Sequence, residues 1–219
     1  MVLMLARTAL VRSNRLSSGG GGGAVPTFVA VGAVQTEDAE EYAGAAANDI
    51  GVIIVSADSN PTISDITDWT AFSATVTSGS NGTRAFWKRM PGPVGTVALN
   101  VSGANVSGVI MFGIRGAITT GDPFEDYQSQ VGTGTAQTSD SITTTGANRL
   151  AIRVGGTQAF IADIGSPPSG YTQAFENNFE PCFSMDYKSV PTATTEAAST
   201  RTLGTSTSWF THTFAMIPA

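Results

Sequence analysis

Acidic side chains are the residues of this sequence with the most evident capacity for chemistry. Three of them, Asp122, Glu125 and Asp126, lie within a turn-rich segment, 121–127. A glycosidase needs two carboxylates held at a defined separation across a cleft, and loop carboxylates also suit Ca²⁺. Acids this close together in one loop more often accept hydrogen bonds from the turn's own backbone. We therefore expect a structural turn, with a cation site and catalysis as the alternatives.

A second acidic group comprises Glu37, Asp38, Glu40 and Glu41. These four side chains are spaced too closely along the chain to converge on one ion. They open segment 36–47, where an alanine-containing stretch predicts one or two helical turns with the acids at the favourable N-terminal end. We expect a solvated face, and a basic partner or a cation is the alternative.

The sequence contains one histidine, His212, and one cysteine, Cys182. One imidazole cannot build a metal site of several histidines, and one thiol cannot form an internal disulfide. No G-x-S-x-G motif accompanies His212, so we expect a satisfied or exposed strand histidine rather than a catalytic one. Cys182 is expected to be a small buried apolar residue. These residues predict no catalytic centre, no metal site and no cofactor.

Five aromatic residues could form a platform for stacking sugars: Trp69, Trp87, Trp209, Tyr171 and Tyr187. Aromatic side chains on the strands of a sandwich more often belong to the core. We expect core positions, and a sugar-binding platform is the alternative.

Charged residues make up only 13% of the 219 residues, against roughly 25% in an ordinary soluble domain. A surface so poor in charge is easier to understand if partner molecules cover much of it. The net charge of −6 is also uneven, because residues 1–23 carry +3 and no acid, which leaves −9 for the remainder. An acidic body argues against nucleic-acid binding. No apolar run approaches the roughly 20 residues that a membrane-spanning helix requires.

Short apolar or alternating runs separated by turn residues fill the chain after residue 25. This spacing is typical of an antiparallel sandwich or barrel. Asn81-Gly82 is a hairpin signal, because both residue types tolerate positive φ. Segments 165–170 and 191–199 are expected to be exposed polar loops. The expected strands are 27–34, 51–55, 69–77, 83–90, 94–101, 106–114, 139–145, 149–154, 171–175, 182–187 and 209–217.

Glycines 19–23 divide the chain into an arm (1–16), a Gly/Ser-rich linker (17–24) and a body (25–219). The glycine run lacks the Lys-Ser/Thr that follows a phosphate-binding loop. Sixteen residues cannot bury an apolar face alone, so the arm needs a partner surface. Its apolar side chains would bury there, by strand addition for example, and its arginines would pair with acids. The expected contact residues are Leu3, Leu5, Arg7, Val11, Arg12 and Arg15.

Several runs together resemble a β-sandwich family of virion structural proteins of tailed phages, of the head-fibre, capsid decoration or tail-appendage type. The similar pieces are Asn48-Asp49-Ile50 leading into Val52–Val55, Trp69, Ala85-Phe86-Trp87-Lys88-Arg89, Phe112-Gly113-Ile114-Arg115-Gly116, Asn148-Arg149-Leu150-Ala151-Ile152 and Thr213-Phe214-Ala215-Met216-Ile217. The resemblance covers most of residues 25–219. It implies a jelly-roll-like or related sandwich without a catalytic centre.

The expected fold is therefore all-β, an antiparallel β-sandwich (jelly-roll-like) with an extended N-terminal arm. The expected function is that of a non-enzymatic phage virion structural protein, a capsid decoration or head-fibre protein anchored by its arm. Its partners would be other virion proteins, above all the major capsid protein, and further copies of itself, for which a trimer is one plausible symmetry. The expected location is the virion, with no nucleic-acid or membrane partner. The alternative is a tail-associated appendage that binds host-surface glycans.

Overall fold

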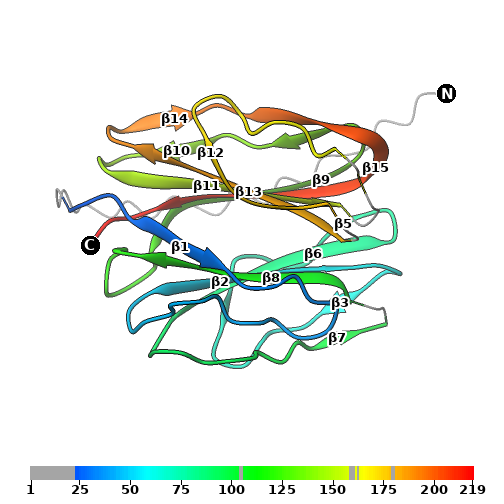
Figure 1. The fold of residues 1–219 in the computed structure, drawn as a ribbon, viewed down its shortest axis with the longest axis horizontal. Coiled ribbons are helices and arrows are strands. Elements are labelled where there is room, and N and C mark those ends of the chain that lie inside the picture. Colours follow the sequence, from blue (N-terminus) through cyan, green and yellow to red (C-terminus); the bar gives the residue numbers. More distant parts are fainter. Residues whose placement is uncertain (1–22, 104–105, 158–160, 162, 179–180) are drawn as a thin grey trace.

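The computed structural model describes residues 23–103, 106–157, 161, 163–178 and 181–219. Two antiparallel sheets are stacked face to face in this part of the chain (Figure 1). The described residues contain no helix, and so none that is long and apolar enough to cross a membrane. The predicted all-β antiparallel sandwich is confirmed.

The first sheet is six-stranded, with the order β1-β8-β2-β6-β4 and β5 paired to β6. The second is five-stranded, with the order β12-β13-β11-β15-β9. The strands of the first sheet are β1 (Thr27–Val31), β2 (Ile50–Ala57), β4 (Thr70–Ala71), β5 (Val76–Ser78), β6 (Asn81–Arg89) and β8 (Val106–Arg115). Those of the second sheet are β9 (Phe124–Ser139), β11 (Arg149–Thr157), β12 (Thr172–Asn177), β13 (Cys182–Val190) and β15 (Ser199–Met216). Two small pairs complete the set: β3 (Thr62–Ile63) with β7 (Val101–Ser102), and β10 (Ile142–Thr144) with β14 (Thr194–Glu196).

Each half of the chain forms its own sheet. Strands up to β8 build the lower, blue-to-green layer of Figure 1, and strands from β9 onwards build the upper, green-to-red layer. The chain crosses between the layers at 116–123. This strand order does not establish the predicted jelly-roll connection, which stays a prediction.

Both faces of the first sheet are buried, which explains its apolar strands. Along β2, Val52 and Ile54 point into the core between the sheets, whereas Ile53 and Val55 point to a second cluster on the outer side. The chain's own segments 39–42, 63–69 and 90–101 cover that outer side. A strand buried on both faces reads as a continuous apolar run rather than as an alternation. This is the pattern of Gly51–Val55 in the sequence.

The outer face of the second sheet is buried too, but much of it is polar. Along β11, Ile152 and Val154 face the core, and Arg153 between them faces outwards. Further polar residues with little exposure on this face are Asp186 on β13 and Arg201 on β15. Segments 140–147, 163–171 and 191–201, which include the β10–β14 pair, lie on this side of the sheet. The two sheets therefore share one apolar core but have chemically different outer layers.

Three expectations were wrong in detail. Segment 36–47 forms turns and isolated bridges instead of helical turns, because Ala39 pairs with Val97 and Gln35 with Val109. Segment 94–101 is mostly irregular and serves as cover for the outer cluster. The 16-residue strand β9 was not expected, because the polar composition of 124–139 carries no apolar signal. The expected strands 27–34 and 139–145 are shorter in the structure, 69–77 is divided between β4 and β5, and 209–217 is part of the longer β15. The expected loop 191–199 contains the short strand β14.

The predicted hairpin exists, with its turn two residues earlier than expected. Ser78 pairs with Asn81, so Gly79 and Ser80 form the two-residue loop. Gly79 supplies the positive φ of 60°, as the first position of a type II′ turn requires. Gly82 lies inside β6, where a Cβ atom would collide with Pro61.

Gly113 on β8 is required by close packing. A Cβ atom there would overlap the ring of Tyr42, which lies over the outer face of the first sheet. We expect Gly113→Ala to lower the free energy of unfolding by about 1–3 kcal/mol, through overpacking of a buried contact. Urea denaturation measures the loss. The control is Gly204→Ala on β15, where the nearest atoms would lie 3.4 Å from the new methyl group. Equal losses in the two variants would contradict the packing argument.

Candidate functional site

The predicted contact residues of the arm lie outside the described residues. Leu3, Leu5, Arg7, Val11, Arg12 and Arg15 all precede residue 23. Their role stays a prediction.

The acids at 122–126 diverge to separate structural partners. Asp122 Oδ1 accepts the backbone N–H of Phe124 at 3.0 Å, as expected of a turn. Glu125 and Asp126 lie in strand β9 rather than in a loop. Glu125 pairs with Arg149, with 2.9 Å between Nε and Oε2, and it also accepts the hydroxyl of Thr145. Burial alone would raise the pKa of Glu125, but the hydrogen bonds from Arg149 and Thr145 outweigh it and hold the pKa below its ordinary value.

Two of the four acids at 37–41 bind the covering segment 94–101, and Glu40 accepts the side-chain amide of Gln35. Glu41 accepts the backbone N–H groups of Val94 and Gly95, at 2.7 and 3.1 Å. Asp38 accepts the N–H of Leu99 at 3.3 Å. These carboxylates tie segment 36–47 to segment 94–101, so they fasten the cover of the first sheet. Within the described ranges no three His, Cys, Asp or Glu side chains are grouped so that they could hold a metal ion.

His212 lies fully buried between the two sheets. Thr83 donates its hydroxyl proton to the carbonyl of Val55 at 2.9 Å, so it accepts from Nε2 of His212, also at 2.9 Å. Nδ1 of His212 is then the acceptor for the hydroxyl of Tyr127, again at 2.9 Å. Burial lowers the pKa of His212 to about 3, which keeps the ring neutral. The histidine therefore links the sheets, and neither ring nitrogen faces a carboxylate.

The remaining chemically distinctive residues take structural positions. Cys182 is buried with Ile161 and Trp209 in a small apolar cluster on the outer side of the second sheet. Trp69 lies in the outer cluster of the first sheet, and Trp87 packs against the core near Phe124. Tyr187 stacks on Phe28, and Tyr171 covers Arg153, with 4.5 Å from the guanidinium carbon to the ring centre. The five aromatic residues are dispersed and form no common platform.

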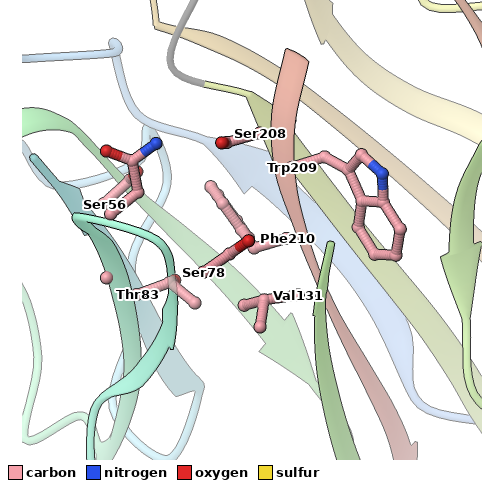
Figure 2. Close-up of a pocket in the computed structure, with 9 residues that line it drawn as sticks. Ser56, Ser78, Thr83, Val131, Ser208, Trp209 and Phe210 are labelled. Carbon is pink, nitrogen blue, oxygen red and sulfur yellow. The ribbon is translucent and has the colours of Figure 1, made fainter. Parts of the chain in front are cut away.

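One cavity, of about 10 Å³, lies between the two sheets at the β5–β6 hairpin (Figure 2). Ser56, Ser78 and Thr83 line it from the first sheet, and Val131 and Phe210 from the second. Figure 2 shows the indole of Trp209 on the opposite side of β15 from Phe210. None of the nine lining residues has a titratable side chain, so none of them could act as a general acid or base.

A second cavity, of about 20 Å³ and partly open to solvent, lies on the outer face of the second sheet. Its charged residues are Arg153, Asp186 and Arg201, which are 4%, 2% and 6% exposed. Arg201 holds Asp186 through two hydrogen bonds, of 3.2 Å from Nε and 2.5 Å from Nη2. The remaining lining residues are Gln137, Ser139, Val154, Gly155, Pro168, Ser184, Ser199 and Thr211.

The electrostatics of this second cavity are dominated by desolvation. Burial raises the pKa of Asp186, against the hydrogen bonds and the positive charge of Arg201. Arg153 has only neutral acceptors, the hydroxyl of Ser199 and the carbonyl of Ala197, the latter at 2.5 Å. With two guanidinium groups and one carboxylate, the cavity carries a formal charge of +1. The concentration of buried charge makes this cavity the strongest candidate for a binding site.

Sequence reasoning missed this cavity, although a signal was present. Arg153 stands alone within Ala151-Ile152-Arg153-Val154, at a position where an outward-facing residue of a sandwich is normally exposed. Its burial follows from the covering segments around Ala197 and Ser199, whose docking depends on tertiary contacts. Asp186 lies on β13 beside β11, whereas Arg201 lies in the first part of β15, which pairs with β9 at Gln137 and not with β11. The two residues meet because this part of β15 belongs to the segments that cover the outer face of the sheet.

All eight lysine and arginine residues of the body contact intramolecular acceptors. Six form ion pairs, Arg89 donates to the carbonyl of Gly121, and Arg153 donates to Ala197 and Ser199. The six pairs are Arg84–Asp65, Lys88–Asp68, Arg115–Asp49, Arg149–Glu125, Lys188–Glu196 and Arg201–Asp186. The basic groups of the body thus serve the fold, while several acids remain outside these pairs.

No family model, curated protein or solved structure matches this chain.

Proposed function

We propose that this protein is a non-enzymatic virion structural protein of a tailed phage, a capsid decoration or head-fibre protein anchored by its N-terminal arm. The observation that carries the proposal is the use of polar groups in the body. All eight lysine and arginine residues of the body bind acceptors within the chain, and His212 is locked between the sheets. A body whose basic groups all serve the fold suits a structural block better than a reaction centre.

The arm and the body have complementary roles in this proposal. The arm carries three arginines and no acid, whereas the body carries −9. Arg7, Arg12 and Arg15 would pair with acidic groups of the major capsid protein, and the apolar side chains of the arm would bury beside them. Repeated copies, such as a trimer, would convert a weak individual contact into avidity. The glycine linker would let the body adapt to a curved shell.

The test is the protein content of phage particles whose genome encodes this chain, separated into heads and tails and measured by mass spectrometry. We expect the full chain in the head fraction and a variant lacking residues 1–16 in neither fraction. Neutralising Arg7, Arg12 and Arg15 together is expected to remove up to about 3 kcal/mol of binding, on the order of a hundredfold in affinity per contact.

The matched control deletes Gly19–Gly21, which shortens the linker and leaves the arm intact, and it is expected to bind like the full chain. If the full chain is found with tails, the glycan-binding appendage replaces this proposal. Absence of the full chain from all particles refutes the virion role altogether. An arm deletion that still binds refutes the anchoring mechanism.

A further inference from the structure

We infer that the cavity on the outer face of the second sheet is a binding site for a small oxyanion, a carboxylate or phosphate group, with Arg153 as its main ligand. This inference does not depend on the proposed virion role. It rests on the charge balance of the cavity, on unpaired buried polar atoms and on the chemistry of the lining.

The first argument is the charge balance. Asp186 is the only carboxylate that lines the cavity in the described part of the chain, and both of its oxygens bind Arg201. Two further acids lie nearby: Glu196 pairs with Lys188, whereas Glu176 keeps its charge, accepts the neutral side-chain amide of Gln173 and lies outside the lining of the cavity. Arg153 is therefore a buried cation without a carboxylate of its own. Leaving a buried charge uncompensated is strongly unfavourable, and an anion beside Arg153 would neutralise the cavity.

The second argument is a donor and a hydroxyl that have no partner. Nε of Arg153 is buried and makes no hydrogen bond in the described structure, and neither does Oγ1 of Thr213. Arg153 and Thr213 are directly opposite each other on β11 and β15. Directly opposed side chains on one face of an antiparallel pair have Cβ atoms about 5 Å apart. Thr213 is not among the lining residues, so Nε of Arg153 is the unpartnered donor that an oxyanion in the cavity would meet.

The third argument is the lining. Four hydroxyls lie in the lining, but Thr211 donates its proton to the carbonyl of Thr138, and Ser139 and Ser199 hydrogen-bond each other. Ser184 is the hydroxyl that remains to donate to an anion. The guanidinium fork matches the geometry of carboxylates and phosphates. The space inside the cavity is about 20 Å³, so only one small acidic group can enter and the rest of a larger molecule must lie outside. A neutral sugar would leave the charge of Arg153 uncompensated.

The test measures the thermal unfolding of the full chain at pH 7 with sodium acetate, sodium phosphate or sodium glucuronate. Sodium chloride at matched ionic strength and glucose are the controls. We expect a saturable rise in Tm with at least one oxyanion, about 5 °C at a hundredfold excess over Kd, and no saturable rise with either control. Phosphate alone would identify a phosphate source, and acetate or glucuronate a carboxylate source. No saturable rise with any of the three oxyanions overturns the inference.

Variants locate the site. Arg153→Lys keeps the charge but loses the fork, and is expected to weaken binding at least about tenfold. Arg153→Met is expected to abolish the saturable rise. The matched control is Arg89→Met on the first sheet, because Arg89 also has no carboxylate partner and an unpaired nitrogen, but is less buried. The inference is supported if Arg89→Met keeps the full rise in Tm, Arg153→Lys binds more weakly and Arg153→Met shows no saturable rise. The inference is refuted if Arg153→Lys binds the oxyanion with unchanged affinity, or if Arg89→Met loses the rise in Tm to the same extent. If Arg153→Met does not fold, the titration of the unchanged protein decides.

Discussion

Replacing Asp186 by Asn is expected to lower the free energy of unfolding by about 3–5 kcal/mol, the largest loss that we expect from one polar substitution in this protein. Asp186 is the carboxylate that two buried arginines share, through hydrogen bonds to Arg201 and through the nearby charge of Arg153. The ion pair itself contributes little, because its burial costs nearly as much as its attraction gains. The variant loses stability because its cavity holds two buried guanidinium groups and no carboxylate to compensate their charge.

Asp65→Asn is the matched control for Asp186→Asn. Asp65 also binds an arginine, Arg84, at 2.5 Å, but its side chain is 79% exposed. Exposed ion pairs contribute about 1 kcal/mol or less. Urea denaturation of both variants and of the unchanged protein at pH 7 gives the comparison. Equal losses would show that burial does not determine the energetics of the Asp186 pair.

The apolar strands of the fold were predictable because each carries its own signal. Gly51–Val55 and Arg149–Val154 are runs that can be buried only inside a sheet, and both fall within strands β2 and β11. Strand β9 carries no such signal, because most of its 16 residues are polar or glycine and only partly buried. It forms because β15 beside it offers a long row of backbone partners, from Ser199 to Met216. Hydrophobic periodicity in a sequence reports which side chains are buried. It cannot predict a strand that forms through backbone pairing alone.

The candidate site was less predictable than the fold, for a related reason. The predicted acids at 122–126 and 37–41 are real structural contacts, yet they diverge. The residues that do converge, Arg153, Asp186 and Arg201, come from three strands whose order in the sheet differs from their order in the chain. Their burial also requires a covering layer that is built from distant segments, among them the β10–β14 pair. Both conditions are set by long-range packing and leave no local pattern in the sequence.

The sole histidine gives the fold a specific sensitivity to acid. The pKa of His212 is about 3 in the folded protein, against about 6.5 in the unfolded chain. The unfolded state therefore binds the proton first as the pH falls, so the contribution is fully present above pH 6.5 and is lost progressively down to pH 3. Between pH 6.5 and pH 3 this loss amounts to about 5 kcal/mol of the free energy of unfolding. The cost arises because a protonated ring would place a charge between the sheets, where Nδ1 must accept from Tyr127.

His212→Gln is expected to remove this acid sensitivity. The amide of glutamine is uncharged at every pH, and it can donate to Thr83 and accept from Tyr127. Between pH 7 and pH 4.5 the unchanged protein should lose about 2–3 kcal/mol more stability than the variant, measured by urea denaturation at each pH. Carboxylates that titrate in this range are common to both proteins and cancel in the difference. Because His212 is the sole histidine, its ring proton resonances can be followed without ambiguity, and they should not titrate between pH 8 and 4.5. A midpoint near pH 6.5 in the folded protein would contradict the buried neutral ring.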